Sequence, residues 1–572
     1  MSSWLFPSLR GYQREWLRGD LIAGLTVWAV LVPEALAYAS IAGVSPVVGL
    51  YAAPGALIFY AAFGSSRHLI TGPMSATAAL SAATVAAYVT AGSSQYVTFT
   101  AALAISAGLV AVIAGLLRLG FLANFISEPV MKGFIVGLAL TIIAGQLPKL
   151  FGVQKGSGDF FQKIWDLITK LGDTHVLTLV IGLASLAIVF GLRRAAPGVP
   201  GSLVAVAFGV LVVAIFKLDK HGVAIVGHID RGLPSLGLPD LPFQDYLKLA
   251  GSGVGVILVG FAEGLGAAKT YAAEHHYEVD ANREMIGLGA ANLASGLSSG
   301  MVVNGSLSKT AVNGSAGANS QVSGLFVAGL TIVTLLLLTG LFEKLPEATL
   351  AAVVIAAVIE LVDIPALIRL YRVYSRRLVH AYGVAARPDF LAAIAALLGV
   401  TVLDTLPGLF IGIATSLILL LYWSSRPRVA ELGRVPGTNQ WADIEAHPEN
   451  EPEPGIVVVR VDGGLYFANA DWVRAHLRRA GSRPGTKAVV LDGATAPFLD
   501  VTAAEMLGRA ADELGRRGVE LLLARDIGQV RDVLRRSDVG PRLQRIYPSV
   551  HAAIDAVHAR TRGADSPYAT KP

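Results

Sequence analysis

The stretch TGPMSATAAL at residues 71–80 places a Gly-Pro break directly before a run of small residues that is typical of a helix. A second break, VVNGSLSKTAV at 302–312, lies in the second half of the chain. Glycine and proline interrupt helices, because glycine adds backbone freedom and proline lacks an N–H group. Each break therefore predicts a short helix that begins inside an apolar region.

The composition around the breaks indicates a membrane protein. Of 572 residues, 53% are hydrophobic and 15% are charged, against about 25% charged in soluble proteins. Charged residues are sparse before about residue 425 and dense after it, so we expect a membrane domain followed by a soluble domain. The net charge of +5 belongs to loops that flank the membrane and does not indicate nucleic-acid binding. The absence of cysteine excludes disulfides, thiolate metal sites and a cysteine nucleophile.

The apolar segments are long enough to cross a membrane as helices, or to cross half of it inside the protein. About fourteen are expected, at residues 21–40, 44–62, 73–92, 98–117, 129–148, 175–192, 199–216, 250–273, 283–298, 307–317, 321–340, 346–362, 389–404 and 407–424. Arg10, Arg14 and Arg18 precede the first segment, and Arg193 and Arg194 follow the sixth. Because arginine favours cytoplasmic loops, we expect a multi-pass protein of the plasma (inner) membrane with both termini cytoplasmic.

Divided into two sevens, the predicted helices place the breaks at equivalent positions, at the starts of the third and the tenth. An odd number of helices per half inverts the second half, which is the inverted-repeat pattern of secondary transporters. Two helix N-termini would then meet near the bilayer midplane, with unpaired N–H groups and positive dipole ends that suit an anion. The alternative is that Gly and Pro only kink packed helices.

Four stretches extend these observations to a known family: PEALAYASIAGVSPVVGLY at 33–51, GSSRHLITGPMSATAAL at 64–80, GSLSKTAVNGSAGANSQVSG at 305–324 and SSRPRVAELGRVPGT at 424–438. They resemble segments of the SulP anion transporters, the sulfate permease family. The resemblance implies fourteen helices in seven-plus-seven inverted repeats, core and gate domains, a cytoplasmic STAS domain and commonly a homodimer. Family substrates include sulfate, bicarbonate, chloride, oxalate and C4-dicarboxylates.

The C-terminal part alternates strand-like and helix-like stretches, which predicts a small α/β domain. The strands are expected in 455–470, 487–494 and 519–526, and an amphipathic helix in 502–518. The expected organisation is an N-terminal cytoplasmic segment 1–20, a membrane domain 21–424, a linker 425–454, a STAS domain 455–562 and a tail 563–572.

Related soluble STAS proteins carry a phosphorylated serine directly after an aspartate. The matching position here, after Asp500, is Val501. We therefore expect the STAS domain to serve assembly or regulation.

Glu34 follows Pro33 inside the first predicted helix. A carboxylate within a spanning helix is a functional candidate, because burying it unpaired is costly. Its alternative role is a structural ion pair with Lys309. Tyr38 lies one helical turn later and can donate its hydroxyl to an anion, or only pack.

The starts of the third and tenth helices supply the other expected anion contacts. These belong to Met74, Ser75, Ala76, Leu307, Ser308 and Lys309. A serine at such a position can also be only an N-cap. The family usually has arginine where Lys309 stands. Arginine holds an oxyanion in a bidentate manner, whereas lysine is a point charge that can lose its proton.

Glu263, in the eighth predicted helix, is the inverted counterpart of the acid in the first. Some proton-coupled SulP proteins carry a glutamate there, so Glu34 and Glu263 are the candidates for proton coupling. Pairing with Lys309 is the alternative role of Glu263. His275 and His276 resemble a metal pair, but adjacent helical residues point about 100° apart, so neither a metal nor a cofactor is expected.

Ionised Glu34, Glu263 and Lys309 sum to one negative charge, so a bound dianion favours the entry of a proton. The expected function is proton-coupled sulfate uptake by a secondary active transporter, not an enzyme. C4-dicarboxylate transport, Na⁺-coupled bicarbonate transport and anion exchange remain alternatives. From another class, a membrane-anchored STAS signalling protein is disfavoured by the residue after Asp500.

Overall fold

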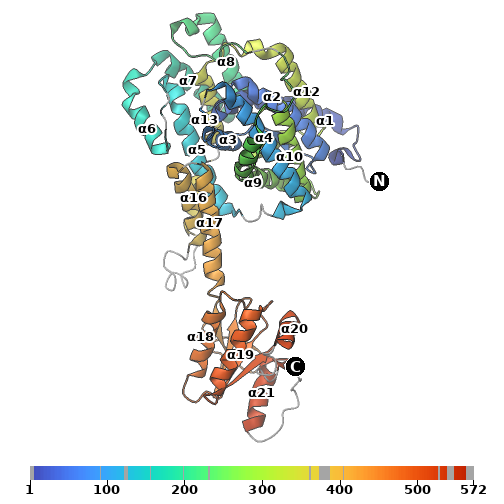
Figure 1. The fold of residues 1–572 in the computed structure, drawn as a ribbon, viewed down its shortest axis with the longest axis vertical. Coiled ribbons are helices and arrows are strands. Elements are labelled where there is room, and N and C mark those ends of the chain that lie inside the picture. Colours follow the sequence, from blue (N-terminus) through green and yellow to red (C-terminus); the bar gives the residue numbers. More distant parts are fainter. Residues whose placement is uncertain are drawn as a thin grey trace. The chain divides into compact units, whose positions relative to one another are not determined.

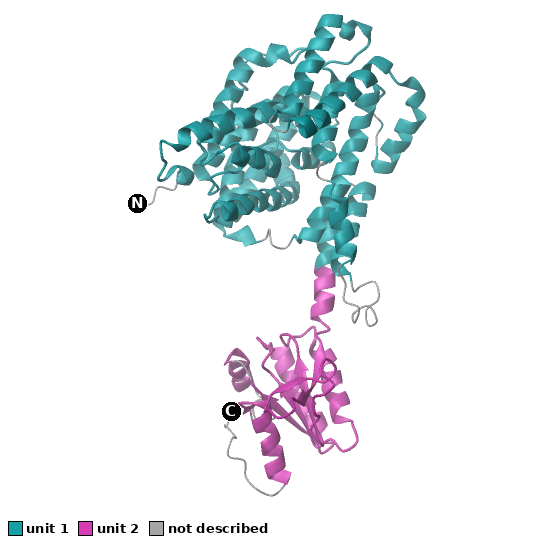
Figure 2. Cartoon of the chain, turned by 180° about the vertical axis from the view of Figure 1, so that it is seen from behind, with its two compact units in different colours: residues 1–416 teal, residues 417–572 magenta. Residues whose placement is uncertain are grey.

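The computed structural model describes residues 5–90, 92–121, 126–154, 156, 158–196, 199–229, 232–359, 362–372, 387–403, 405–525, 528–537 and 546–561. The expected tail, 563–572, lies outside these residues. The chain divides into two compact units, residues 1–416 and 417–572, which are described separately (Figure 2).

Unit 1 is helical, and helices occupy the apolar segments that the sequence marks (Figure 1). Its long elements, with α17 running on into unit 2, are α1 (Trp16–Ala42), α2 (Pro46–Phe63), α3 (Ser75–Ala86), α4 (Ser94–Leu116), α5 (Glu128–Phe151), α6 (Phe160–Thr169), α7 (Val176–Ala195), α8 (Gly201–Phe216), α9 (Phe243–Glu274), α10 (Ala281–Leu297), α11 (Leu307–Ser315), α12 (Val322–Val333), α13 (Glu347–Ile359), α14 (Ile364–Arg372), α16 (Pro388–Leu403) and α17 (Thr405–Ser424). Short helical turns add Pro7–Leu9, Leu171–Asp173, Leu218–His221, Thr334–Leu338 and Thr339–Leu341.

Within the described ranges, nine helices are long and apolar enough to cross a membrane. Two shorter helices, α6 and α14, were not expected from the sequence, because charged and polar residues interrupt their apolar runs. The core helices approach one another closely through small residues. At Gly108 of α4, an added Cβ would lie 2.7 Å from the carbonyl oxygen of Gly289 in α10. Such small-residue contacts are the usual means of packing helices in a membrane.

Two short strands join the two halves of unit 1. Strand β1 (Ile70–Gly72) pairs antiparallel with β2 (Asn304–Ser306), with Ile70 opposite Ser306 and Gly72 opposite Asn304. The two sequence breaks, more than 200 residues apart, therefore lie side by side.

Unit 2 contains a sheet with the strand order β4-β3-β5-β6-β7-β8. Its elements are β3 (Val429–Arg434), β4 (Trp441–Asp443), β5 (Ile456–Val461), α18 (Ala470–Gly481), β6 (Ala488–Asp492), α19 (Val501–Gly515), β7 (Glu520–Ala524), α20 (Gly528–Arg536), β8 (Ile546–Tyr547) and α21 (Val550–Thr561). Strands β5 to β8 are parallel, and β3 is antiparallel to β4 and β5. Helices α18, α19 and α20 pack on one face of the sheet and α21 on the other.

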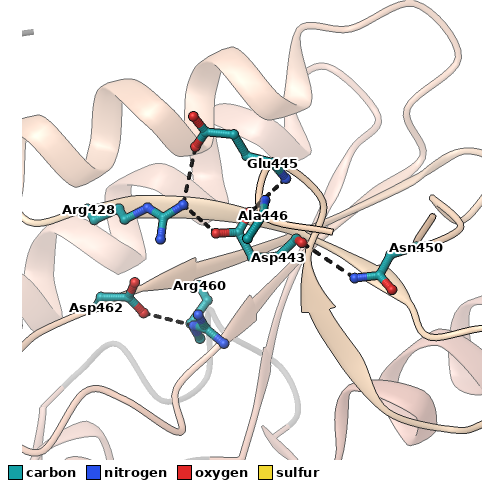
Figure 3. A network of polar contacts seen from close by, with 7 residues as sticks. All are labelled: Arg428, Asp443, Glu445, Ala446, Asn450, Arg460 and Asp462. Carbon is teal, nitrogen blue, oxygen red and sulfur yellow. Dashed lines mark hydrogen bonds and ion pairs between the residues drawn. The ribbon is translucent and has the colours of Figure 1, made fainter. Parts of the chain in front are cut away.

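The segment 425–454, expected as a linker, differs from that expectation. It supplies β3 and β4, which extend the sheet beyond β5. An ion-pair network links the two strands. Arg428, directly before β3, contacts Asp443 at the end of β4 and lies 3.2 Å from Glu445 (Figure 3). Only β4 lies at the edge of the sheet, since β3 pairs with both β4 and β5. Strand β4 has three residues, too few for a hydrophobic alternation that the sequence could reveal.

Candidate anion site at the paired helix starts

The strand pair β1–β2 sets the starts of two helices next to each other. Helix α11 follows β2 without a gap, and α3 begins three residues after β1. Met74, the N-cap of α3, makes no capping bond with its side chain. The strand register places the two breaks side by side, and that their helix starts face each other at the bilayer midplane stays a prediction.

The cap of α11 differs from that of α3. The Ser306 hydroxyl accepts a hydrogen bond from the backbone N–H of Lys309 at 3.2 Å. Ser306 Oγ also lies 3.1 Å from Ser308 Oγ. The capping serine is therefore Ser306, which sequence reasoning did not single out, although a serine three residues before Lys309 was a usable signal.

A buried ion pair lies between the two helix starts. Lys309 Nζ is 2.7 Å from Glu34 Oε2, and the side chains are 1% and 10% exposed. Lys309 Nζ also donates to the backbone oxygen of Pro73 at 3.2 Å. Because an unpaired buried charge is strongly destabilising, these two contacts explain how a lysine is held here. The ion pair named above as the alternative role of Glu34 is thus present.

Tyr38 completes the cluster on α1. It is buried, and its ring centre is 5.2 Å from Lys309 Nζ, within the range of a cation–π contact. The residues expected to contact the anion differ in burial. Met74, Ser75 and Ala76 are buried, whereas Leu307 and Ser308 are exposed.

Glu263 lies on α9 and is half-buried, within electrostatic reach of Lys309. In the part of the chain that the structure describes, it makes no ion pair, so the pairing with Lys309 named as its alternative role is not found. Asn304 of β2 lies against Gly260 and Gly264 on the same helix, where an added Cβ would come within 3.1 Å of its side chain. Both polar atoms of this buried carboxamide lack a hydrogen-bond partner among the described residues.

Polar side chains also tie the two breaks together. Asn313 Nδ2 donates to the His68 carbonyl at 3.0 Å, and Gln321 Nε2 donates to the carbonyls of Ser66 and Leu69 at 3.1 and 2.8 Å. These contacts were not predicted. The available signal was the presence of amide side chains in an apolar chain.

Two buried carboxylates anchor the flanking loops and were also missed. Glu284 accepts bonds from Tyr60 Oη at 2.6 Å and from the Ser65 and Ser66 amides at 2.6 and 2.9 Å. Asp20 accepts a bond from the Ser320 hydroxyl at 2.7 Å. Each carboxylate satisfies donors of a tight turn, which fixes the chain that leads into or out of a break.

The histidine pair does not form a metal site in the described ranges. His275 instead stacks on His68, with ring centres 4.2 Å apart. The His68 Nε2 atom lies 3.0 Å from the Ala318 carbonyl, and Nδ1 lies 3.1 Å from the Tyr277 hydroxyl. This cluster therefore links the two break-flanking segments.

Comparisons with known proteins identify the family of the chain. Residues 17–381 match the sulfate permease family, and residues 447–553 match the STAS domain. A probable sulfate transporter of Mycobacterium tuberculosis is 36% identical over 555 residues, covering 96% of this chain and 97% of that protein. A high affinity sulfate transporter of Stylosanthes hamata is 31% identical over 553 residues, covering 91% of this chain and 81% of that protein.

Solved structures share the fold. The murine Slc26a9 anion transporter in the inward-facing state has a TM-score of 0.86 at 22% identity, covering 97% of this chain and 93% of that one. The transmembrane domain of the cyanobacterial bicarbonate transporter BicA has a TM-score of 0.61 at 24% identity, covering 70% and 98%. Fold and site together define a membrane transporter with a C-terminal STAS domain. The chain belongs to the sulfate permease family, which is a transporter family and not an enzyme family.

Proposed function

We propose that the chain is a secondary active transporter that carries sulfate with protons into the cell across the plasma membrane. The observation that carries the proposal is the buried Glu34–Lys309 pair at the meeting of two helix starts. Helix N-termini offer N–H donors and positive dipole ends, so the place suits an anion. The sulfate transporters of Mycobacterium and Stylosanthes support sulfate over other anions.

In this proposal the anion lies between the starts of α3 and α11. The backbone N–H groups of Ser75, Ala76 and Ser308 face it, and the Tyr38 hydroxyl adds a donor. Lys309 is already held by Glu34 and Pro73. An incoming anion therefore competes with the Glu34 carboxylate for the ammonium group, and binding loosens the ion pair.

The proton follows from the charges of the site. Glu34, Glu263 and Lys309 sum to one negative charge, and a sulfate dianion brings the total to three. Unit charges of like sign 4 Å apart repel by about 4 kcal/mol at an effective dielectric of 20. Protonating both carboxylates returns the total to one negative charge. Glu34 or Glu263 is therefore the proposed carrier of the coupled proton.

The proposed topology has fourteen membrane segments in two inverted sevens, which form core and gate domains, with both termini cytoplasmic. Arg193 and Arg194 at the end of α7 support this orientation. We also propose a membrane domain at 21–424 and a homodimer. The STAS domain, expected at 455–562, is proposed to include β3 and β4 as well, because both strands belong to its sheet. Detergent-free mass measurement and protease access from each side of the membrane test these points.

Uptake of labelled sulfate into proteoliposomes tests the substrate. Excess unlabelled sulfate should compete fully, whereas fumarate, bicarbonate and chloride should compete weakly. Strong competition by fumarate would favour a C4-dicarboxylate carrier. Na⁺-dependent competition by bicarbonate would favour a Na⁺-coupled bicarbonate carrier, and uptake that requires a counter-anion inside would favour exchange.

The second candidate function, to be distinguished from transport, is that of a membrane-anchored signalling protein. Val501 stands where related soluble STAS proteins carry the phosphorylated serine. Deleting residues 430–572 separates the two functions. A transporter should retain anion binding in the remaining membrane domain, whereas a signalling protein should lose its activity.

A further inference from the structure

Helix α6 lies in the connection between α5 and α7, and the two ends of this connection are hydrogen-bonded to each other. The backbone N–H of His175, before α7, donates to the carbonyl of Phe151, the last residue of α5, at 3.0 Å. Between these points α6 has its own start signal. Asp159 accepts a bond from the Gln162 amide at 2.8 Å, and Gln162 Oε1 accepts one from the Asp159 amide at 3.1 Å. This capping box shows that α6 is a defined helix and not a chance turn.

The two sides of α6 have opposite chemistry. Phe161, Trp165 and Ile168 follow helical spacing and are 57%, 67% and 52% exposed. Ile164 joins them along a shallow surface groove, which Gln162 and Asp166 also line. The opposite arc carries Gln162, Lys163, Asp166 and Lys170. Leu167 alone on this helix is buried, so protein covers only one edge of the apolar side.

The helix that follows α6 in the chain also exposes apolar side chains. After a short turn, α7 exposes Val176, Val180 and Leu183 along one side, and α7 is apolar enough to cross the membrane. Arg193 and Arg194 end α7, so α6 lies at the opposite membrane face. A tryptophan beside aliphatic residues, with lysines on the other arc, is the pattern of a helix held at a membrane surface.

We propose that the open face of α6, formed by Phe161, Ile164, Trp165 and Ile168, inserts into the lipid leaflet opposite to Arg193 and Arg194. The face is too small for a stable protein interface. A ten-residue helix is about 15 Å long and about 10 Å wide, whereas a stable interface buries about 800 Å² on each partner. Lipid has no such size requirement, because acyl chains cover an apolar patch of any area.

The absence of cysteine allows single-site spin labelling of the full chain in phospholipid vesicles. The test variant is Ile168→Cys on the open face, and the matched control is Lys163→Cys on the polar arc, which leaves the capping box intact. Oxygen partitions into lipid and a nickel chelate stays in water. The ratio of oxygen to chelate accessibility at position 168 should exceed that at position 163 by at least about threefold, as expected for a helix with one face in the acyl region.

Equal ratios at the two positions would overturn the proposal, as would low accessibility to both reagents at position 168. Efficient disulfide cross-linking of Phe161→Cys between two chains would assign the face to a second copy and also overturn it. Sulfate uptake by the same labelled variants should equal that of the unsubstituted protein. If the lipid test fails while uptake is normal, the proposed transport function is unaffected. If the parent protein and every variant show no sulfate uptake, the proposed transport function fails and the lipid proposal is unaffected.

Discussion

Oppositely charged side chains meet in both units, but their surroundings differ. In unit 1, Lys309 and Glu34 are 1% and 10% exposed and lie between two helix starts. In unit 2, the cation is half-exposed: Arg428 is 47% exposed, and it contacts Asp443, 9% exposed, and Glu445, 74% exposed, at the edge of a sheet (Figure 3). Exposed pairs contribute about 0–1 kcal/mol, whereas breaking a buried pair costs about 3–5 kcal/mol. Burial therefore marks the pair of unit 1 as the one whose removal should alter activity.

The largest expected effect comes from adding charge where the anion is proposed to bind. Ser75→Glu places a carboxylate at the start of α3 and should abolish sulfate binding, because it repels an anion and occupies the helix dipole. Ser308→Pro should also abolish binding by removing a backbone donor. Calorimetry on purified protein measures both. Ser308→Ala is the control and should weaken binding only modestly, while near-normal affinity in Ser75→Glu would move the site elsewhere.

Lys309 gives the next largest effect. Lys309→Ala leaves the Glu34 carboxylate buried without its cation and should raise the KM for sulfate by about tenfold or more, equivalent to about 1.4 kcal/mol or more. Lys309→Arg should keep transport and favour divalent oxyanions, because arginine binds them in a bidentate manner.

The matched control for Lys309 is Arg428→Ala in unit 2, which removes a cation from an exposed network. Its KM for sulfate should equal that of the unsubstituted protein. Unchanged KM in Lys309→Ala would leave Lys309 a structural role at most.

The smallest expected effect concerns an exposed pair of unit 2. The Arg483 guanidinium contacts both carboxylate oxygens of Glu431, at 2.6 and 2.7 Å. The two side chains are 51% and 36% exposed. A double-mutant cycle with Arg483→Ala and Glu431→Ala should give a coupling energy of about 0.2–1 kcal/mol in urea unfolding of unit 2. A coupling energy above about 3 kcal/mol would mean that this exposed pair contributes as much as a buried one, which would contradict the difference drawn between the two units.

Local signals in the sequence predicted the helix starts but not what surrounds them. The Gly72-Pro73 break is readable because both residues act on their own backbone. The pairing of β1 with β2 is not readable, because a three-residue ribbon joined by backbone bonds leaves no side-chain pattern. Helix α6 was also missed, because the polar residues of one side interrupt the apolar residues of the other side along the sequence.

The buried ion pair was foreseen only as an alternative, since sequence gives the residues Glu34 and Lys309 but not their separation. Glu284 and Asp20 were missed because their partners are backbone amides of distant turns, whereas the partner of Ser306 is the local amide of Lys309. Any serine or acid in an apolar chain is compatible with that role, so composition cannot select the ones that are used.

Sulfate uptake into proteoliposomes against imposed pH gradients, with a pH-sensitive dye inside, tests the central claim most directly. A bound dianion attracts a proton, and by reciprocity a proton strengthens anion binding by the same factor. Uptake should therefore rise as external pH falls from about 7.5 to about 5.5, a range above the ordinary titration of a free glutamate, with acidification inside. Glu34→Gln should still bind sulfate but lose the pH dependence, unless Glu263→Gln does so instead, which would assign the proton to Glu263. Uptake by the unsubstituted protein with no dye response and no pH dependence would contradict proton coupling.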